Sequence, residues 1–331
     1  MNMLYSGSLK KFVSFTIPDY IDLCSKFYPS QSKYTLQAFE SSLKRVEKIY
    51  SKKLEQLDLI YLTNVDDVIK HLDKDKFSLN TKISTISTLS KCIKILDGPL
   101  SIQDKYTKKL NTLMNERQED EKKQTKSLSE SENWVEFPIM EKKVNNLVTK
   151  MLSQDIEFNR FRDYLCLSLF VLQTPTRLGN YLNCKVLRNI PENKEELEKS
   201  YNYIYKGNDG FYNFIFNKYK TSKTLGSKER KIKNKNLNAI LDRYFNKYNT
   251  KNKYFLIDIL GKEIKQSTFT DILKSQTKIL FKKSFSVNLI RHSYLTHFIK
   301  QDPTLIQKIE VATEMGQTYK INVQDLYIKY Y

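Results

Sequence analysis

The sequence predicts a mainly α-helical protein with a small antiparallel β-sheet in its second half. Three observations lead to this prediction. Apolar residues recur at helical spacing through the first 125 or so positions, the segment 115–133 is almost purely polar, and the stretch YNYIYKGNDGFYNFIFNKYK alternates apolar with polar residues. We therefore expect a helical N-terminal domain (1–125), a linker (126–135) and an α+β C-terminal domain (136–331).

The helices of the first domain have recognisable start signals. Thr16, Ser32 and Asn64 each precede an apolar periodic stretch, as N-cap residues do. Ser101 and Asp104 resemble a capping box for a later helix. Before that box, a helix that ends at the sequence DGP has one apolar face, made of Ile83, Ile86, Leu89, Ile93 and Leu96. These signals predict a bundle of five helices.

The polar segment 115–133, NERQEDEKKQTKSLSESEN, lies between the two predicted domains. With almost no apolar side chain, it cannot bury itself, so we interpret it as a solvated helix end followed by the linker. The alternative is an exposed helix tail inside a single domain.

The second half mixes helices with strands. The apolar run 164–172 predicts a buried helix. Turn signals at 208–210 and 223–226 divide the alternating region into three antiparallel strands between Tyr201 and Asn234. Helical periodicity resumes after residue 236 and again, in two further stretches, behind Ser267 and from Val287 toward the C-terminus.

Composition restricts the function. The 331 residues include 56 Lys and Arg against 37 Asp and Glu, a net charge of +19 that predicts a polyanionic partner. Four separated cysteines without a CxxC pair indicate a reducing compartment, and three histidines leave little scope for zinc catalysis. No Gly-rich phosphate loop or metal-ligand cluster is visible, so we expect neither cofactor nor metal. The N-terminus lacks a signal-peptide pattern and no apolar run is long enough to span a bilayer, so we expect no membrane association.

Two arginines are candidates for chemistry. Arg177 comes after the buried run and a Thr-Pro-Thr turn, and a buried arginine requires an anion. Arg291 and His292 lie in SVNLIRHSYLTHF, whose periodicity predicts a helix. Two guanidiniums that converge can hold the nonbridging oxygens of a phosphodiester. The alternatives are a structural ion pair for Arg177 and a surface position for Arg291.

Five motifs resemble the tyrosine recombinase (phage integrase) family in order and approximate spacing. They are TPTRLGNYLNCKV, KYKTSK, RHSYLTHF, the MGQ turn and a tyrosine ten residues after that turn. RHS followed by TH is the most specific of them, and the pattern covers about half of the chain. The resemblance implies the family's helical core-binding domain, which clamps DNA, followed by its α+β catalytic domain.

The resemblance assigns roles to four residues. Arg177 and Arg291 match the two catalytic arginines, and Lys220 matches the lysine between the second and third strands, with Lys223 as its alternative. Tyr327 matches the nucleophile that forms a 3′-phosphotyrosyl bond to DNA. Three other tyrosines lie nearby, but Tyr327 fits the family spacing better than Tyr319, Tyr330 or Tyr331.

Two positions depart from the family pattern. Asn288 stands where the family usually has histidine or lysine, and Gln317 stands where it has histidine or tryptophan. Both side chains can donate a hydrogen bond to a phosphate oxygen or hold the nucleophile, but neither can transfer a proton. His292 also matches a common family residue and is expected to buttress the site. It points about 100° away from Arg291 on a helix, so it is a weak candidate for the missing base.

The resemblance implies a site-specific recombinase or integrase that cuts and rejoins duplex DNA without cofactor or metal, assembled as a tetramer on paired DNA sites. No small-molecule substrate is expected. Such an enzyme works where DNA is accessible, in a nucleus, a viral factory or a bacterial cytoplasm, and the Lys-, Asn- and Ile-rich composition indicates a mobile element or DNA virus as its origin. Two alternatives stay open: a DNA-binding protein on the same fold with impaired catalysis, and a type IB topoisomerase-like enzyme.

Overall fold

The computed structural model describes residues 16–57, 60–190, 193–317 and 329. The chain divides into two compact units, residues 1–123 and residues 124–331. The described part is mainly helical with one small sheet, as the sequence predicts. Among the described helices, none combines the length and apolar character that a membrane span requires.

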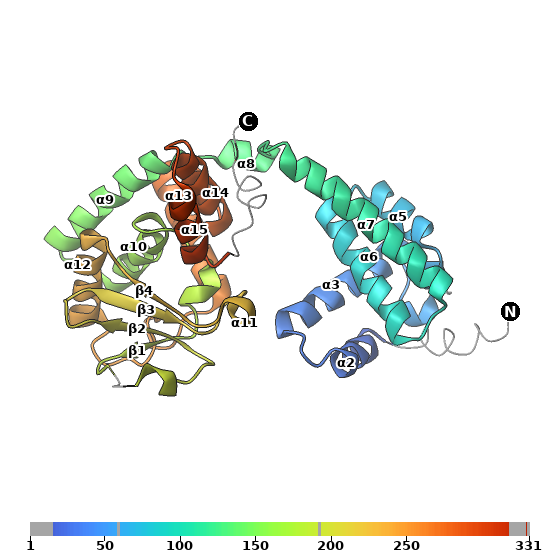
Figure 1. Cartoon of the computed structure of the whole chain (residues 1–331), viewed down its shortest axis with the longest axis horizontal. Helices are drawn as coiled ribbons and strands as arrows, with labels where there is room; N and C mark the ends of the chain where they lie inside the picture. Colours follow the sequence, from blue (N-terminus) through green and yellow to red (C-terminus); the bar gives the residue numbers. More distant parts are fainter. Residues whose placement is uncertain (1–15, 58–59, 191–192, 318–328, 330–331) are drawn as a thin grey trace. The chain divides into compact units, whose positions relative to one another are not determined.

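Unit 1 is a helical bundle (Figure 1). Its helices start largely where the sequence predicts: Thr16 and Asp19 form a capping box, and Ser32 and Asn64 accept hydrogen bonds from their own first turns. The box expected at Ser101 is absent, because Pro99 is the N-cap of that helix. The elements are α2 (Ile17–Phe27), α3 (Lys33–Tyr50), η1 (Leu54–Gln56), α4 (Ile60–Thr63), α5 (Val65–Lys74), α6 (Leu79–Ile95) and α7 (Leu100–Lys122).

The core of unit 1 contains buried tyrosines as well as aliphatic residues. Tyr20 and Tyr61 share a hydrogen bond between their hydroxyls, and the Tyr106 hydroxyl donates to the Tyr61 carbonyl over 3.0 Å. All three side chains are at most 1% exposed. Each ring therefore contributes apolar area to the core while its polar end is satisfied, which removes the cost of a buried unpaired hydroxyl.

The segment expected as a linker contains regular structure. Helix α7 continues to Lys122, with exposed ion pairs along its last turns, and α8 spans Leu128–Asn133. Val135 belongs to the core of unit 2, and the Trp134 carbonyl accepts a hydrogen bond from Lys283. The two apolar residues that follow the polar segment thus anchor the end of the predicted linker in unit 2.

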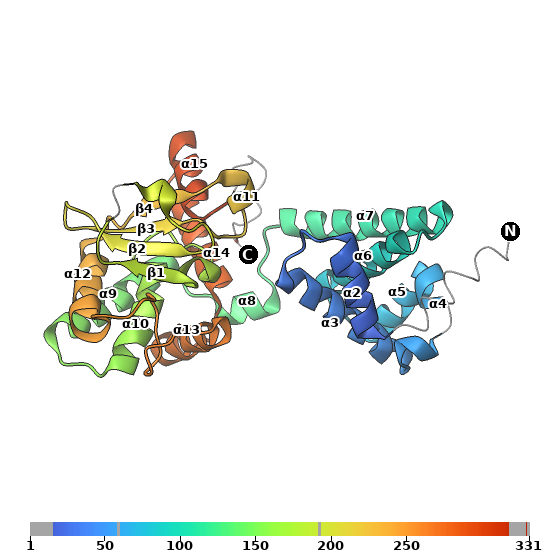
Figure 2. The same cartoon turned by 90° about the horizontal axis from the view of Figure 1, so that it is seen from below.

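Unit 2 contains a four-stranded sheet in the order β1-β2-β3-β4 (Figure 2). The strands are β1 (Cys184–Leu187), β2 (Asn202–Lys206), β3 (Tyr212–Phe216) and β4 (Lys228–Lys231). The last three are antiparallel neighbours, as predicted, and β1 adds a parallel strand that the sequence did not reveal. The turn expected at 223–226 is a short helix, α11 (Ser222–Leu225), which Gly226 ends.

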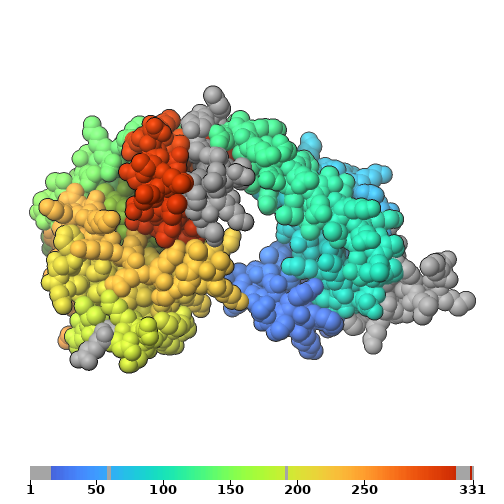
Figure 3. All heavy atoms as spheres, viewed as in Figure 1, coloured from blue at the N-terminus to red at the C-terminus, as the bar shows by residue number. Residues whose placement is uncertain are grey.

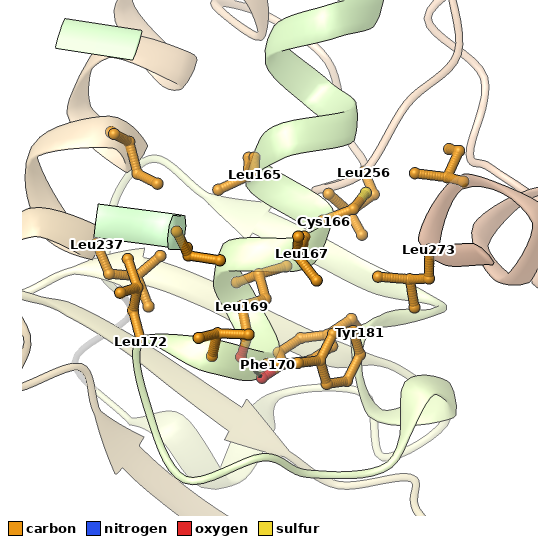
Figure 4. Packing of buried hydrophobic residues seen from close by; sticks show 14 of the residues in the cluster. Leu165, Cys166, Leu167, Leu169, Phe170, Leu172, Tyr181, Leu237, Leu256 and Leu273 are labelled. Carbon is orange, nitrogen blue, oxygen red and sulfur yellow. Dashed lines mark hydrogen bonds between the residues drawn. The ribbon is translucent and has the colours of Figure 1, made fainter. Parts of the chain in front are cut away.

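The longer helices of unit 2 gather on one face of this sheet (Figure 1). The central one, α10, is the predicted buried run, and its residues Leu165, Leu169 and Phe170 pack among Tyr181, Leu237 and Leu273 (Figure 4). The other elements are α9 (Phe137–Ser153), α10 (Phe158–Val171), η2 (Leu178–Tyr181), η3 (Lys194–Glu196), α12 (Lys235–Arg243), the π-helical turn η4 (Tyr244–Tyr248), α13 (Gln266–Phe281), α14 (Val287–Ile299) and α15 (Leu305–Glu314).

Candidate functional site

Two arginines from distant parts of unit 2 contact the turn that follows α15. Nη1 of Arg177 donates to the Gly316 carbonyl over 2.6 Å, and Nη2 of Arg291 lies 3.5 Å from the Met315 carbonyl. The hydroxyl of Thr221 also donates to the Gly316 carbonyl, over 2.9 Å. Arg177 and Arg291 therefore meet at two consecutive carbonyls, although 114 positions separate them in the sequence (291 − 177).

Arg177 is positioned by the end of the buried helix α10. The helix stops before the Thr-Pro-Thr turn, whose Thr176 is fully buried, and Arg177 is the N-cap residue of η2. Pro175 cannot continue a helix and restricts the residue before it, which fixes where the chain leaves α10. The half-buried side chain of Arg177 is thus held at the surface of the core with its guanidinium toward the turn.

Arg291 comes from α14, a helix that is buried on most sides. The arginine side chain is 3% exposed, and its neighbours Ile290 and Ser293 are fully buried. The Ser293 hydroxyl donates to the Val135 carbonyl over 2.7 Å, which ties α14 to the segment before α9. Such anchoring gives Arg291 a fixed position, which electrostatic catalysis requires of a charged donor.

Strand β4 brings two more cations to the same helix end. Nζ of Lys228 donates to the Thr313 carbonyl over 3.0 Å, and Nη2 of Arg230 lies 3.7 Å from Oε2 of Glu314. Both residues pair with core phenylalanines of β3, so they lie on the face that the helices cover. Neither residue was predicted from the sequence, although the two-residue spacing of Lys228, Arg230 and the fully buried Ile232 is typical of one face of a strand.

The electrostatics of this cluster favour an anion. Four cationic side chains and one carboxylate, that of Glu314, meet at residues 313–316 within the described part of the chain. The C-terminal end of a helix carries partial negative charge, so the carbonyls at the end of α15 stabilise cations in the absence of a ligand. Burial lowers the pKa of Lys228. Because carbonyl dipoles compensate four cations only in part, the site retains an excess of positive charge.

The remaining predicted residues lie at different depths. Lys220 and Lys223 are exposed in the connection between β3 and β4, and Asn288 is exposed in the first turn of α14. His292 is half-buried on α14. Gln317 is 6% exposed, and its Nε2 donates no hydrogen bond among the described residues. The structure therefore places a buried amide donor directly after the arginine-binding turn.

Tyr327 lies outside the described residues, as do Tyr319, Tyr330 and Tyr331. Lys329, two positions after Tyr327 in the sequence, is described. Its backbone N–H donates to the hydroxyl of Thr296 over 3.0 Å, and Thr296 follows Arg291 on the same helix, α14. The described end of the chain thus contacts the helix that supplies one of the two arginines.

The described residues contain no group of three or more His, Cys, Asp or Glu side chains that could hold a metal ion. The four cysteines are free and buried. Nitrogen donors from arginine, lysine and glutamine dominate the site, and these bind oxyanions rather than metals.

Gly316 provides a direct test of the turn. Its φ is +68°, and a Cβ at this position would lie 3.5 Å from Nη1 of Arg177 and 3.6 Å from the ring of Tyr219. We expect Gly316→Ala to destabilise unit 2 by about 1–2 kcal/mol through the left-handed backbone alone. Both distances are ordinary van der Waals contacts, so the position of the Arg177 guanidinium and the phosphate affinity should stay close to those of wild type. Thermal unfolding and phosphate titration of Gly316→Ala beside wild type measure these two expectations, and a protein as stable as wild type would contradict the first.

No family model matches the sequence, and no curated protein matches it. A solved structure described as "Crystal structure of XerA recombinase" matches 95% of this chain and 94% of its own chain, with 14% sequence identity and a TM-score of 0.39.

Proposed function

We propose that this chain is a site-specific DNA recombinase or integrase that cuts and rejoins duplex DNA through a 3′-phosphotyrosyl bond to Tyr327. The observation that supports the proposal most is the convergence of Arg177 and Arg291 on consecutive carbonyls of one turn. A phosphodiester that enters this cluster offers its nonbridging oxygens as charged acceptors in place of neutral carbonyls, and charge-assisted hydrogen bonds are the stronger ones.

The chemistry is an in-line displacement at phosphorus. The Tyr327 hydroxyl gives its proton to solvent water and attacks phosphorus, so that an O–P bond to the tyrosine forms while the bond to the 5′-oxygen breaks. The leaving 5′-oxygen takes a proton from a lysine, Lys220 in the family pattern with Lys223 as its alternative. Lys228 is a further candidate, because burial lowers its pKa and makes it a stronger acid. Attack by a different 5′-hydroxyl reverses the step and joins new partners.

Arg177 and Arg291 neutralise the charge that develops on the nonbridging oxygens of the transition state. Gln317, with its buried and unused amide donor, is suited to hydrogen-bond the phosphate or the nucleophile. The phosphotyrosyl bond conserves the energy of the broken phosphodiester, so the reaction needs no nucleotide. Unit 1 serves in this proposal as the second DNA-binding domain, and four protomers assemble on paired sites.

The net charge of +19 predicts strongly salt-dependent DNA binding. Each phosphate contact adds nearly one to the slope of log K against log salt concentration, so several contacts weaken binding by about 10³-fold between 50 and 200 mM salt. Binding alone does not separate a recombinase from a DNA-binding protein without activity. A covalent bond between the protein and DNA separates them.

Covalent capture tests the proposal. Wild type, Tyr327→Phe and the control Tyr330→Phe are incubated with a nicked random-sequence duplex library, denatured, and the attached DNA is sequenced. We expect adducts with wild type and Tyr330→Phe, none with Tyr327→Phe, and a shared target sequence in the captured DNA. Salt-sensitive binding without any adduct would contradict the proposal and favour a catalytically impaired DNA-binding protein.

A further inference from the structure

Arg230 is a buried cation that the family resemblance does not assign to the site. Its side chain is 9% exposed and lies on the core face of β4, opposite Phe214 of β3. Its Nη1 is buried and has no hydrogen-bond partner in the described part of the chain. A guanidinium in such a place costs stability unless a nearby anion compensates its charge, so a purely apolar side chain would suit a structural role better.

The anion beside Arg230 is Glu314. The distance between Nη2 and Oε2 is 3.7 Å, longer than a hydrogen bond, so the pair interacts through charge. Glu314 is the last residue of α15, directly before the two carbonyls that receive Arg291 and Arg177. The carboxylate side chain is 35% exposed against 9% for Arg230, so Glu314 is the member of the pair that faces solvent.

Glu314 creates a problem for anion binding. Glu314 directly precedes the two residues whose carbonyls receive Arg291 and Arg177, and an uncompensated carboxylate there repels an incoming phosphate. The Glu314 side chain is itself partly exposed, and α15, red in the space-filling view, lies on the visible surface of unit 2 (Figure 3). Glu314 therefore needs a cation of its own if the two arginines are to stay available.

We propose that Arg230 is a positioning residue of the site: it neutralises Glu314 and holds that carboxylate against β4, so that Arg177 and Arg291 remain available for a DNA phosphate. Lys228 acts beside it, since its hydrogen bond to the Thr313 carbonyl joins the same strand to the same helix end. Strand β4 is thus part of the anion site. The identity of the ligand as a DNA phosphate rests on the proposed function. The effect of Arg230 on the binding of an anion does not.

The test is a four-member cycle of wild type, Arg230→Gln, Glu314→Gln and the double variant. Inorganic phosphate affinity is measured by calorimetry, and the rate of covalent DNA capture is measured beside it. We expect Arg230→Gln to lower both the phosphate affinity and the capture rate about tenfold. A change of this size is typical of the interaction between neighbouring charged residues. The double variant lacks the carboxylate that Arg230 neutralises. Its phosphate affinity and capture rate should therefore lie within about twofold of those of Glu314→Gln.

Two controls keep the result interpretable. Arg230→Lys retains the charge and should stay close to wild type. Lys231→Gln removes one charge from the neighbouring position of β4, where Lys231 pairs with Asp209 on the other face, and should change neither readout. Thermal unfolding identifies any variant that fails to fold, in which case Glu314→Gln, with its expected gain in phosphate affinity, decides the question.

Each contrary result has one meaning. A double variant as weak as Arg230→Gln would show that Arg230 contacts the phosphate itself, which overturns a role through Glu314. Equal phosphate affinity in all four proteins would make Arg230 merely structural. Absence of DNA adducts in wild type would defeat the proposed function alone, because the phosphate cycle still reports on Arg230. A wild type that binds no phosphate would overturn both.

Discussion

Replacement of Arg291 by alanine should reduce the rate of covalent DNA capture about 10³-fold, equivalent to about 4 kcal/mol of transition-state stabilisation. The side chain is 3% exposed on a helix anchored at Ser293, so its guanidinium is already in position when DNA binds. Water cannot replace it, because a mobile dipole must reorganise as charge develops whereas a fixed guanidinium need not.

Two variants control this prediction. Arg291→Lys keeps the charge but loses the planar fork, and we expect it to recover only part of the activity. Arg160→Ala removes an exposed arginine of α10, with the same change in net charge, and should leave the rate within about twofold of wild type. Single-turnover capture at saturating DNA measures the chemical step. A loss below tenfold for Arg291→Ala would contradict a role at the phosphate.

Replacement of Asn202 by alanine should destabilise unit 2 by about 3 kcal/mol or more. Asn202 is 1% exposed, and its side chain makes four hydrogen bonds. Its Nδ2 donates to the carbonyls of Asn180 and Lys218 over 2.8 and 3.0 Å, and its Oδ1 accepts from the backbone N–H groups of Asn217 and Lys218 over 2.9 and 2.8 Å. Alanine would leave these buried backbone groups unsatisfied.

These four hydrogen bonds, the Asn202 clamp, join η2, which follows Arg177, to the connection that carries Lys220. Urea unfolding measures the loss as a lower midpoint at unchanged slope. Asn236→Ala is the matched control, because Asn236 is exposed and makes one side-chain hydrogen bond, to Asn145, so we expect a change within about 0.5 kcal/mol. An Asn202→Ala protein as stable as the control would contradict the account of the clamp.

Local signals in the sequence predicted most of the fold. Helix starts at Thr16, Ser32 and Asn64 were predictable because a cap is formed by residues a few positions apart. The parallel strand β1 was not, because its four residues pair with β2 across an irregular segment whose path no local pattern encodes. The helix α11 replaced a predicted turn because a Gly after four residues ends a short helix as readily as it forms a turn.

The candidate site was predictable only where a motif named a residue. The resemblance selected Arg177 and Arg291, and the structure brings both to the turn at Gly316. Their roles, and those of Lys220 and Tyr327, stay predictions. Arg230 and Lys228 were not predicted, because a segment with the sequence KERK is typical of a solvated charged surface. Only its register beside β3 shows that these two side chains face the core.

The central claim, that Arg177 and Arg291 neutralise one scissile phosphate, is tested most directly with a substrate that lacks the charge. A methylphosphonate at the cleavage position replaces one nonbridging oxygen by a neutral methyl group. On this substrate we expect Arg291→Ala to lose less than about tenfold in capture rate relative to wild type, against about 10³-fold on the normal phosphate, because the transition state carries one negative charge fewer for the guanidiniums to stabilise. An equal loss on both substrates would contradict the claim.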